Sequence, residues 1–344
     1  MGPFVRQYGL TLDSLLSAEI VTADGRLRRI SPTRDADLFW AIRGGGGGNF
    51  GVVTSFEFAT VPVDMPFQTQ ALTFPWSAAE RVFEVFQTWV DQLPMHAHPG
   101  LEFVTTQQGP AAQPSVEVSL WYRGKRDRSD AFVDDFVREV GLSPRSRIAR
   151  HQSFYTAEYD EYCQGLTQGQ CAPITRPPGQ LPRVGLSTYS EISRQRWPSP
   201  AVAVLIEALE TWQRDPLLQP PGIDTGLQVA KVIVEPINGA AHAVAATATA
   251  FPHRDGFLVF QFQSRVRPGA SAELVAASQA WVSQLNARLT PWRTGAEYSN
   301  YGNRNLKDWA TAYYARNLPR LRQIKADRDP GNLFRFAQSL RPAG

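Results

Sequence analysis

The residues of this chain best suited to chemistry are phenols and amides in its C-terminal third. Tyr298, Asn300 and Tyr301 stand together in the segment EYSNYGN, and Gln261 and Gln263 lie two positions apart in FLVFQFQ. A phenol can exchange a proton with a substrate, and buried amides need hydrogen-bond partners that a substrate could supply. From the residues alone, two packing tyrosines, one structural glutamine and one exposed glutamine remain the alternative.

The spacing of the two tyrosines suggests different tasks for them. Side chains alternate along a strand, so an extended 297–301 segment would place Tyr298 and Asn300 on one face and Ser299 and Tyr301 on the other. An unperturbed tyrosine titrates near pH ~10, so a base at neutral pH needs a lowered pKa. A nearby cation or a hydrogen bond to the phenolate could lower it. The strand expected at 257–266 carries no carboxylate, which argues against a mechanism that needs an acidic partner for the tyrosine.

A run of five glycines at 44–48 is the most informative segment upstream. Glycine loses more backbone entropy on folding than other residues, so such a run indicates a backbone that must approach something closely. Bare amide groups can cradle a phosphate or a flat ring system. A flexible linker is the alternative, but large apolar residues flank the run. No Lys-Ser or Lys-Thr pair follows it, and it leads into a strand, which excludes a P-loop and a Rossmann fingerprint.

Hydrophobic periodicity predicts the elements that must position these residues. Helices are expected at 35–42, 129–140, 199–214 and 271–289. A further helix is expected to begin at the capping box formed by Ser77 and Glu80. Strands are expected at 17–22, 26–30, 52–58, 101–106, 115–122, 227–234, 243–250 and 257–266, with an irregular segment at 151–198. Runs of strands and helices without strict alternation predict an α+β fold with an antiparallel sheet covered on one face.

Composition excludes several classes of protein. The 344 residues are 43% apolar with a net charge of +3, and no basic block suggests nucleic-acid binding. No apolar run reaches the ~18 residues of a membrane span, and the first residues show no signal peptide. Cys163 and Cys171 could form one disulfide or stay as two thiols, and no zinc spacing accompanies them. We therefore expect small-molecule partners, no metal, no membrane and no nucleic acid.

Three motifs resemble those of berberine-bridge-enzyme-like FAD-linked oxidases of the vanillyl-alcohol-oxidase/p-cresol-methylhydroxylase superfamily. They are RQYGLTLDSLLSAEIVTADGRL with DLFWAIRGGGGGNFGVVTSF, then TAFPHRDGFLVFQFQ, and EYSNYGNRNLKDWATAYYARNLPRLRQIKADRDPGNLFRFAQSL. The resemblance implies part of a PCMH-type FAD-binding domain at 1–63, a substrate domain at 64–296, and a segment at 297–344 that returns to the FAD domain. It also implies an enzyme, an oxidase that removes hydride from an alcohol, a carbohydrate or a secondary metabolite and passes the electrons to O₂.

The resemblance assigns roles to particular residues. Tyr301 is implied as the base, Tyr298 as a pocket residue, and Gln261 and Gln263 as substrate-facing amides. Residues implied to contact FAD are Tyr8, Gly9, Gly46, Gly47, Gly48, Asn49, Phe50, Gly51, Val52, Val53 and Asn300.

Family members carry an upstream segment with a histidine, and often a cysteine, bonded to the flavin. Met1 and Gly2 stand where the last residues of that segment would be, so we expect an N-terminally truncated chain. None of the five histidines takes the covalent role. A truncated, inactive fragment or binding remnant is the alternative function. The chain as written would be cytoplasmic, while export of a longer parent, the substrate and the oligomeric state stay open.

Overall fold

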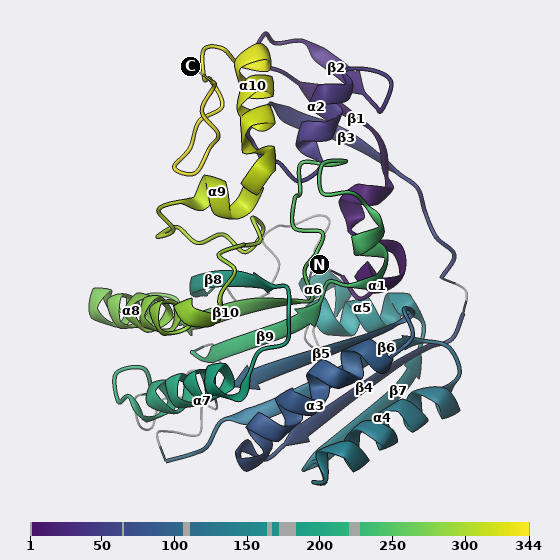
Figure 1. The fold of residues 1–344 in the computed structure, drawn as a ribbon, viewed down its shortest axis with the longest axis vertical. Coiled ribbons are helices and arrows are strands. Elements are labelled where there is room, and N and C mark those ends of the chain that lie inside the picture. The colour runs from purple at the N-terminus through teal and green to yellow at the C-terminus, as the bar shows by residue number, and fades with distance from the viewer. Residues whose placement is uncertain are drawn as a thin grey trace.

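The computed structural model describes residues 2–63, 65–105, 111–163, 167–171, 184–219 and 228–343. Two antiparallel sheets organise the chain (Figure 1), one of seven strands and one of three. Helices and strands combine as the α+β prediction required.

The larger sheet supplies the main framework. Its strands are β4 (Phe67–Phe74), β5 (Ala97–Val104), β6 (Ser115–Arg123), β7 (Ser146–Gln152), β8 (Gly185–Ser193), β9 (Ala230–Pro236) and β10 (Leu258–Val266). They lie in the order β7-β4-β6-β5-β9-β10-β8, and every neighbouring pair is antiparallel. Strands distant in sequence, such as β5 and β9, therefore lie side by side.

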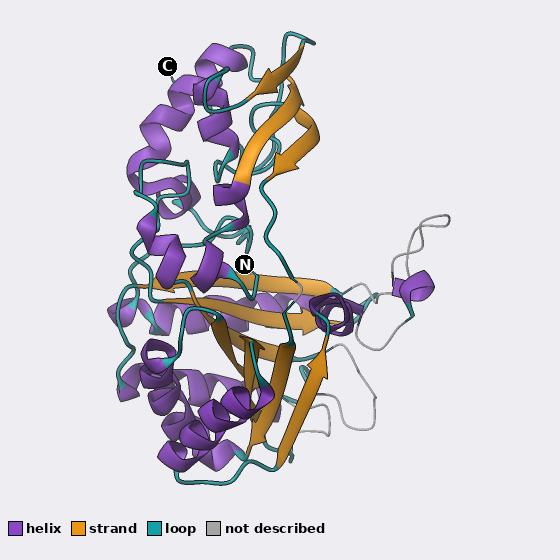
Figure 2. Ribbon diagram, turned by 90° about the vertical axis from the view of Figure 1, so that its right-hand side faces the viewer, coloured by secondary structure: helices purple, strands orange, loops and turns teal. Residues whose placement is uncertain are grey.

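Four helices cover one face of the larger sheet (Figure 2): α3 (Ala79–Gln92), α4 (Arg126–Val140), α7 (Ser199–Arg214) and α8 (Ala272–Arg288). Their apolar sides pack with alternate strand residues into the largest core, in which Phe83, Phe103 and Phe260 are fully buried. Pro200 lies in the first turn of α7, and Gly141 ends α4 in the left-handed conformation, both as predicted.

The opposite face of the larger sheet follows from strand register. Val259 pairs with Glu235, Gln261 with Ile233 and Gln263 with Lys231. Directly opposed residues share a face, so these polar side chains point away from the helix-covered core. Helix α5 (Phe154–Cys163) lies on this open face, where the Phe154 ring meets that of Phe67 at 5.5 Å between ring centroids.

The smaller sheet has the order β2-β1-β3, from β1 (Leu15–Val21), β2 (Leu27–Ile30) and β3 (Val52–Phe58). It shares a core with α2 (Ala36–Ile42), α9 (Trp309–Tyr314) and α10 (Leu318–Arg328). The two ends of the described chain thus build one packed unit, shown purple and yellow in Figure 1. By contrast, β3 is mostly exposed.

Several short helical elements complete the described chain. They are α1 (Val5–Tyr8) and the 3-10 turns Thr11–Ser14, Trp76–Ala78, Gly239–Ala243, Thr290–Trp292 and Ala315–Asn317. Between the sheets, Val5, Leu10, Phe251 and Tyr298 belong to one small buried cluster. A buried ion pair between Arg254 and Asp13, at 2.6 Å, connects the loop that precedes β10 to the 3-10 turn Thr11–Ser14.

Several expected elements were wrong. No strand forms at 243–250, because side chains bind its carbonyls: Trp40 Nε1 donates to Thr247 O and Asn317 Nδ2 to Ala246 O, both at 2.8 Å. The expected irregular segment contains the end of β7, α5, α6 (Gln168–Cys171) and β8. The capping box fails because Ser77 lies in a 3-10 turn and α3 has no side-chain cap. Residues 106, 164–166, 172–183 and 227 of the expected segments lie outside the described residues.

Candidate functional site

The glycine loop, residues 44–51, runs from α2 to β3 and lines an open cavity of about 970 Å³. Gly46 has φ +80°, and a Cβ there would lie 2.5 Å from the Tyr314 hydroxyl oxygen, so a side chain is excluded. A Cβ on Gly47 would meet nothing within 4 Å. The loop is therefore packed tightly behind Gly46 and open at Gly47.

Buried polar groups hold the glycine loop from behind. Lys325 Nζ donates to Asn49 O at 2.7 Å and pairs with Asp329 Oδ2 at 2.6 Å. The Asn49 amide donates to Gly45 O at 2.9 Å and accepts from the Leu340 backbone N–H at 2.8 Å. Because the Asn49 side chain is engaged in these bonds, it holds the loop in place. Asn49 therefore offers only its backbone to the cavity.

Most residues predicted to contact the cofactor lie around this one cavity. The lining includes Tyr8, Gly9, Gly46, Gly47, Gly48, Asn49, Phe50, Gly51, Val53 and Asn300. Val52 is the exception, because it points outward from β3 and is 59% exposed. Bare glycine backbone beside an apolar and aromatic lining suits a flat ring system with phosphates, so the residues present fit a flavin.

The tyrosine turn, residues 298–301, contributes its first three residues to the lining of the same cavity, and Tyr301 lies behind them outside that lining. Tyr301 N–H donates to Tyr298 O at 2.8 Å, which closes a turn where a strand was expected. The predicted separation of the two phenols onto opposite faces is therefore wrong: their rings meet edge to face at 5.1 Å between ring centroids. Tyr298, Ser299 and Asn300 line the cavity, and Asn300 Nδ2 donates to the Tyr298 hydroxyl at 3.0 Å.

Tyr301 has a carboxylate partner that sequence reasoning missed. Its hydroxyl donates to Glu235 Oε2 at 3.1 Å, from the strand beside β10. Burial and the adjacent Glu235 charge raise the pKa of Tyr301, which contradicts the expected lowering. Burial also raises the pKa of Glu235, but His98 and the Tyr301 hydroxyl outweigh it and leave that pKa below the ordinary value. Tyr301 is thus a protonated donor to a carboxylate.

The two glutamines lie on the open face as expected but not in the cavity lining. Gln263 is buried, and its side-chain oxygen accepts from Arg265 Nε at 2.9 Å. Gln261 is half-buried between Ser190 and Ile233 of the neighbouring strands. Their predicted contact with substrate stays a prediction.

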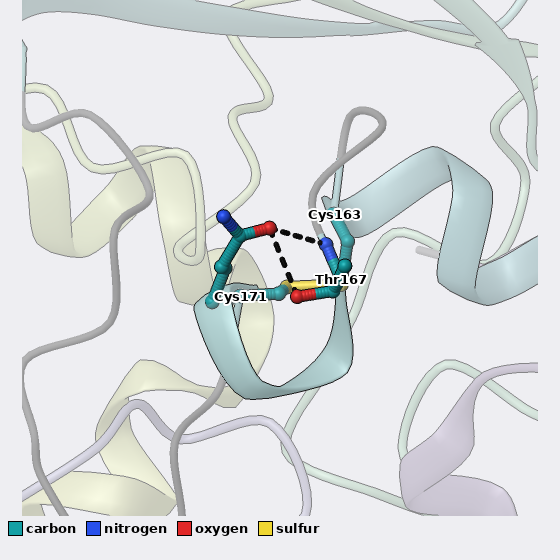
Figure 3. Close-up of a disulfide and its surroundings, with 4 residues drawn as sticks. Cys163, Thr167 and Cys171 are labelled. Carbon is teal, nitrogen blue, oxygen red and sulfur yellow. Dashed lines mark hydrogen bonds between the residues drawn. A yellow bond between two sulfur atoms is a disulfide. The ribbon is translucent and has the colours of Figure 1, made fainter.

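Helix α5 supplies cavity residues from a segment expected to be irregular. Phe154, Glu158 and Tyr162 of this helix line the cavity. A disulfide joins Cys163, the last residue of α5, to Cys171, the last residue of α6 (Figure 3). Of the two alternatives for these cysteines, the disulfide was therefore the right one. Cysteine spacing was the available signal; nothing in the sequence pointed to the helix itself.

Neither a membrane-spanning helix nor a metal-binding group of side chains is found among the described residues. No described helix is both long and apolar enough to span a bilayer. No group of three or more histidine, cysteine, aspartate or glutamate side chains in the described ranges is arranged to hold a metal ion.

Comparison with known proteins supports the family resemblance. Residues 297–341 match the family described as "Berberine and berberine like". An uncharacterized FAD-linked oxidoreductase of Bacillus subtilis is 28% identical over 99% of this chain and 68% of its own length. Tetrahydroberberine oxidase of Berberis wilsoniae is 23% identical over 99% of this chain and 64% of its own length.

A solved chitooligosaccharide oxidase shares the fold. The two chains superpose with a TM-score of 0.81 at 21% identity, covering 100% of this chain and 69% of the oxidase. The chain therefore spans about two thirds of the length of the proteins it resembles.

Proposed function

We propose that this chain, which is similar to berberine-bridge-enzyme-like FAD-linked oxidoreductases, serves to oxidise a small alcohol, carbohydrate or secondary metabolite, with FAD as cofactor and O₂ as final acceptor. The contact between Tyr301 and Glu235 beside the cavity carries this proposal. One solved neighbour is named for a carbohydrate and one relative for an alkaloid, which supports both substrate classes.

The cofactor would lie against the glycine loop. Gly46, Gly47 and Gly48 line the cavity without side chains, and Tyr8, Gly9 and Asn300 line the same space. Flavin, when bound, supplies the acceptor for a hydride from the substrate carbon. The buried Lys325 behind the loop keeps these glycines in place, so the cradle exists before a ligand arrives.

The Tyr301–Glu235 pair would manage the substrate proton. Tyr301 keeps its own proton at neutral pH, because burial and the Glu235 charge raise its pKa. It can accept a proton from a substrate hydroxyl only while its own proton passes to Glu235 Oε2, at 3.1 Å. Glu235 is then the final base of the pair and Tyr301 the group that touches the substrate. Tyr298 and Asn300 shape the wall beside it.

A flavin-reduction experiment tests this proposal. FAD binding to the chain would be followed by flavin fluorescence, and reduction by oligosaccharides or alcohols would be followed anaerobically. We expect Glu235→Gln to slow reduction by about 10²- to 10⁴-fold, the usual effect of losing a general base, without weakening FAD binding. Glu158→Gln is a matched control, because Glu158 lines the cavity but does not contact Tyr301 in the described structure. Equal reduction rates in wild type and Glu235→Gln would reject the proposal.

A second function, binding without turnover, is supported by the bare β3 strand. Phe56 is 55% exposed and Val52 59%, an apolar surface typical of a contact with other protein. FAD binding with no reduction by any tested substrate class would favour this alternative.

A further inference from the structure

His98 lies on the far side of the Glu235 carboxylate from Tyr301. Its Nε2 is 3.8 Å from Glu235 Oε1, while Oε2 of the same carboxylate accepts the Tyr301 hydroxyl at 3.1 Å. At 3.8 Å the first contact is an ion-pair distance and is too long for a hydrogen bond. Each carboxylate oxygen therefore has its own partner, His98 at Oε1 and Tyr301 at Oε2.

The position of His98 in the sheet fixes this arrangement. In β5, His98 shares a face with Glu102, which is opposite Ile233 of β9 and so belongs to the open face. Glu235 is on the same face of β9. The His98 side chain is only 6% exposed, so surrounding structure holds the ring in place.

His98 lacks the partners of a purely structural histidine. A buried imidazole that only fills space usually has both ring nitrogens satisfied. His253, for comparison, binds the Ala312 carbonyl at 2.7 Å. Nδ1 of His98 is buried and has no hydrogen-bond partner among the described residues. The polar contact found for its ring is therefore the one to Glu235.

The other titratable groups near Glu235 do not replace His98. Tyr298 and Tyr301 face it from the tyrosine turn, and Glu161 and Tyr162 from α5. These groups are phenols and a carboxylate, so none of them carries a positive charge that could attract the ionised Glu235. Lys231 is the nearby cation, but its Nζ is paired with Glu102 Oε2 at 2.7 Å. Within the described part of the chain, His98 is the basic side chain that lies within ion-pair distance of Glu235, with its Nε2 at 3.8 Å from Oε1.

We propose that His98 is a positioning residue, which keeps Glu235 ionised and aimed at Tyr301 so that the pair can take up the substrate proton. The inference rests on the proposed function for its catalytic meaning, while the effect of His98 on Glu235 is a property of the chain alone. In the step itself, the substrate hydroxyl proton goes to Tyr301 and the Tyr301 proton goes to Glu235. The hydride from the substrate carbon would pass with its electron pair to the flavin of the proposed function, and the substrate would become a carbonyl compound. His98 exchanges no proton in this scheme.

The direct test measures the ionisation of Glu235 without any flavin. In protein labelled with ¹³C at glutamate side chains, Glu235→Gln identifies the Glu235 signal. We expect His98→Leu to raise the titration midpoint of Glu235 by about one pH unit, the usual scale for a nearby charge partner. His98→Gln, which keeps an N–H donor without a titratable ring, should give a smaller change.

His96→Leu is the matched control. His96 lies two residues earlier, and its ring packs at a tilt against that of Tyr122, at 5.3 Å between ring centroids. An unchanged Glu235 midpoint in a folded His98→Leu protein, or an equal change in His96→Leu, would overturn the inference.

Turnover then separates this inference from the proposed function. In FAD-loaded protein, His98→Leu should slow flavin reduction by about tenfold and move the acid limb of the pH–rate profile to higher pH, with His98→Gln recovering part of the rate. If Glu235→Gln slows reduction and His98→Leu does not, the positioning role is wrong. If Glu235→Gln also has no effect, the proposed function fails, and the Glu235 titration still decides whether His98 controls its ionisation.

Discussion

The glycine loop and the tyrosine turn face the same cavity, but the loop offers backbone amides held by buried partners, whereas the turn offers titratable side chains in mutual contact. Behind the loop, Lys325 and Asn49 have their hydrogen-bonding groups satisfied. In the turn, the Tyr301 hydroxyl donates a hydrogen bond to Glu235, and this contact changes the pKa of both groups. The glycine loop, which buried hydrogen bonds hold in place, suits binding, and we call it the binding wall. The tyrosine turn, whose Tyr301 hydroxyl can exchange a proton, suits reaction, and we call it the reactive wall.

The largest expected effect comes from breaking the reactive wall. Tyr301→Phe keeps the ring and its packing but removes the group that contacts Glu235, so flavin reduction should slow by about 10²- to 10⁴-fold. FAD affinity should stay within about twofold, because the glycine loop is unchanged. Tyr298→Phe is the matched control, since the Tyr298 hydroxyl accepts a hydrogen bond from Asn300 Nδ2, whereas the Tyr301 hydroxyl donates to Glu235. Stopped-flow absorbance measures both, and a slower Tyr298→Phe than Tyr301→Phe would reverse the assignment.

Breaking the binding wall should act on stability. Lys325→Met leaves Asp329 as a buried, unpaired carboxylate, so the free energy of unfolding should fall by about 3–5 kcal/mol. Urea denaturation measures the loss. Lys307→Met, at an exposed lysine, should change it by less than ~0.5 kcal/mol. A loss no greater than that of the control would show that Lys325 does not brace the loop.

A pH-dependent effect should come from the segment just before the tyrosine turn. Burial raises the pKa of Glu297 to about 7, against the opposing charge of Arg293. This pKa exceeds that of the unfolded state, so the protonated form stabilises the fold and the benefit is lost as pH rises from about 4.5 through 7. Glu297→Gln should remove that decline, which we estimate at about 2–3 kcal/mol. Thermal melts between these pH values would decide, and parallel profiles would contradict the prediction.

The smallest expected effect on stability lies at β3, beyond the glycine loop. Phe56→Ser should change the free energy of unfolding by less than ~0.5 kcal/mol, because the side chain is 55% exposed. The same change should reduce concentration-dependent association, since an exposed apolar edge strand favours pairing with other chains. Light scattering at rising protein concentration would detect the difference. Unchanged association would remove β3 as its cause.

Sequence reasoning succeeded where a residue's role is local. The helices at 199–214 and 271–289, and the glycine run between a helix and a strand, were predicted from spacing and capping residues alone. No strand was predicted at β7, because it is exposed along nearly its whole length and shows no alternation of apolar and polar residues. The omission of β4 has another cause: Gln68 and Gln70 occupy its core face, where Gln70 binds Ser129 and Asp130. Polar core residues hide the alternation that marks a strand.

The candidate site was harder to predict, because its partners meet only through the tertiary fold. Glu235 lies 66 residues from Tyr301, on a strand whose neighbours no local pattern reveals. Lys325 reads as one of many surface cations in a charged helix, yet it is fully buried. Motif resemblance identified Tyr301, and the fold supplied the carboxylate that changes how a tyrosine there can act.

The bonds from the C-terminal segment to the glycine loop have a consequence for biosynthesis. Lys325 and Leu340 reach Asn49 across 276 and 291 residues of intervening chain. On a ribosome adding about 5–20 residues per second, the loop would wait unbraced for roughly 14–60 seconds after its own synthesis. The larger sheet, whose strands lie between these two ends, can form in that interval. The cradle would therefore mature late, and a nascent chain would complete its ligand pocket only after residues 325–340 have been made.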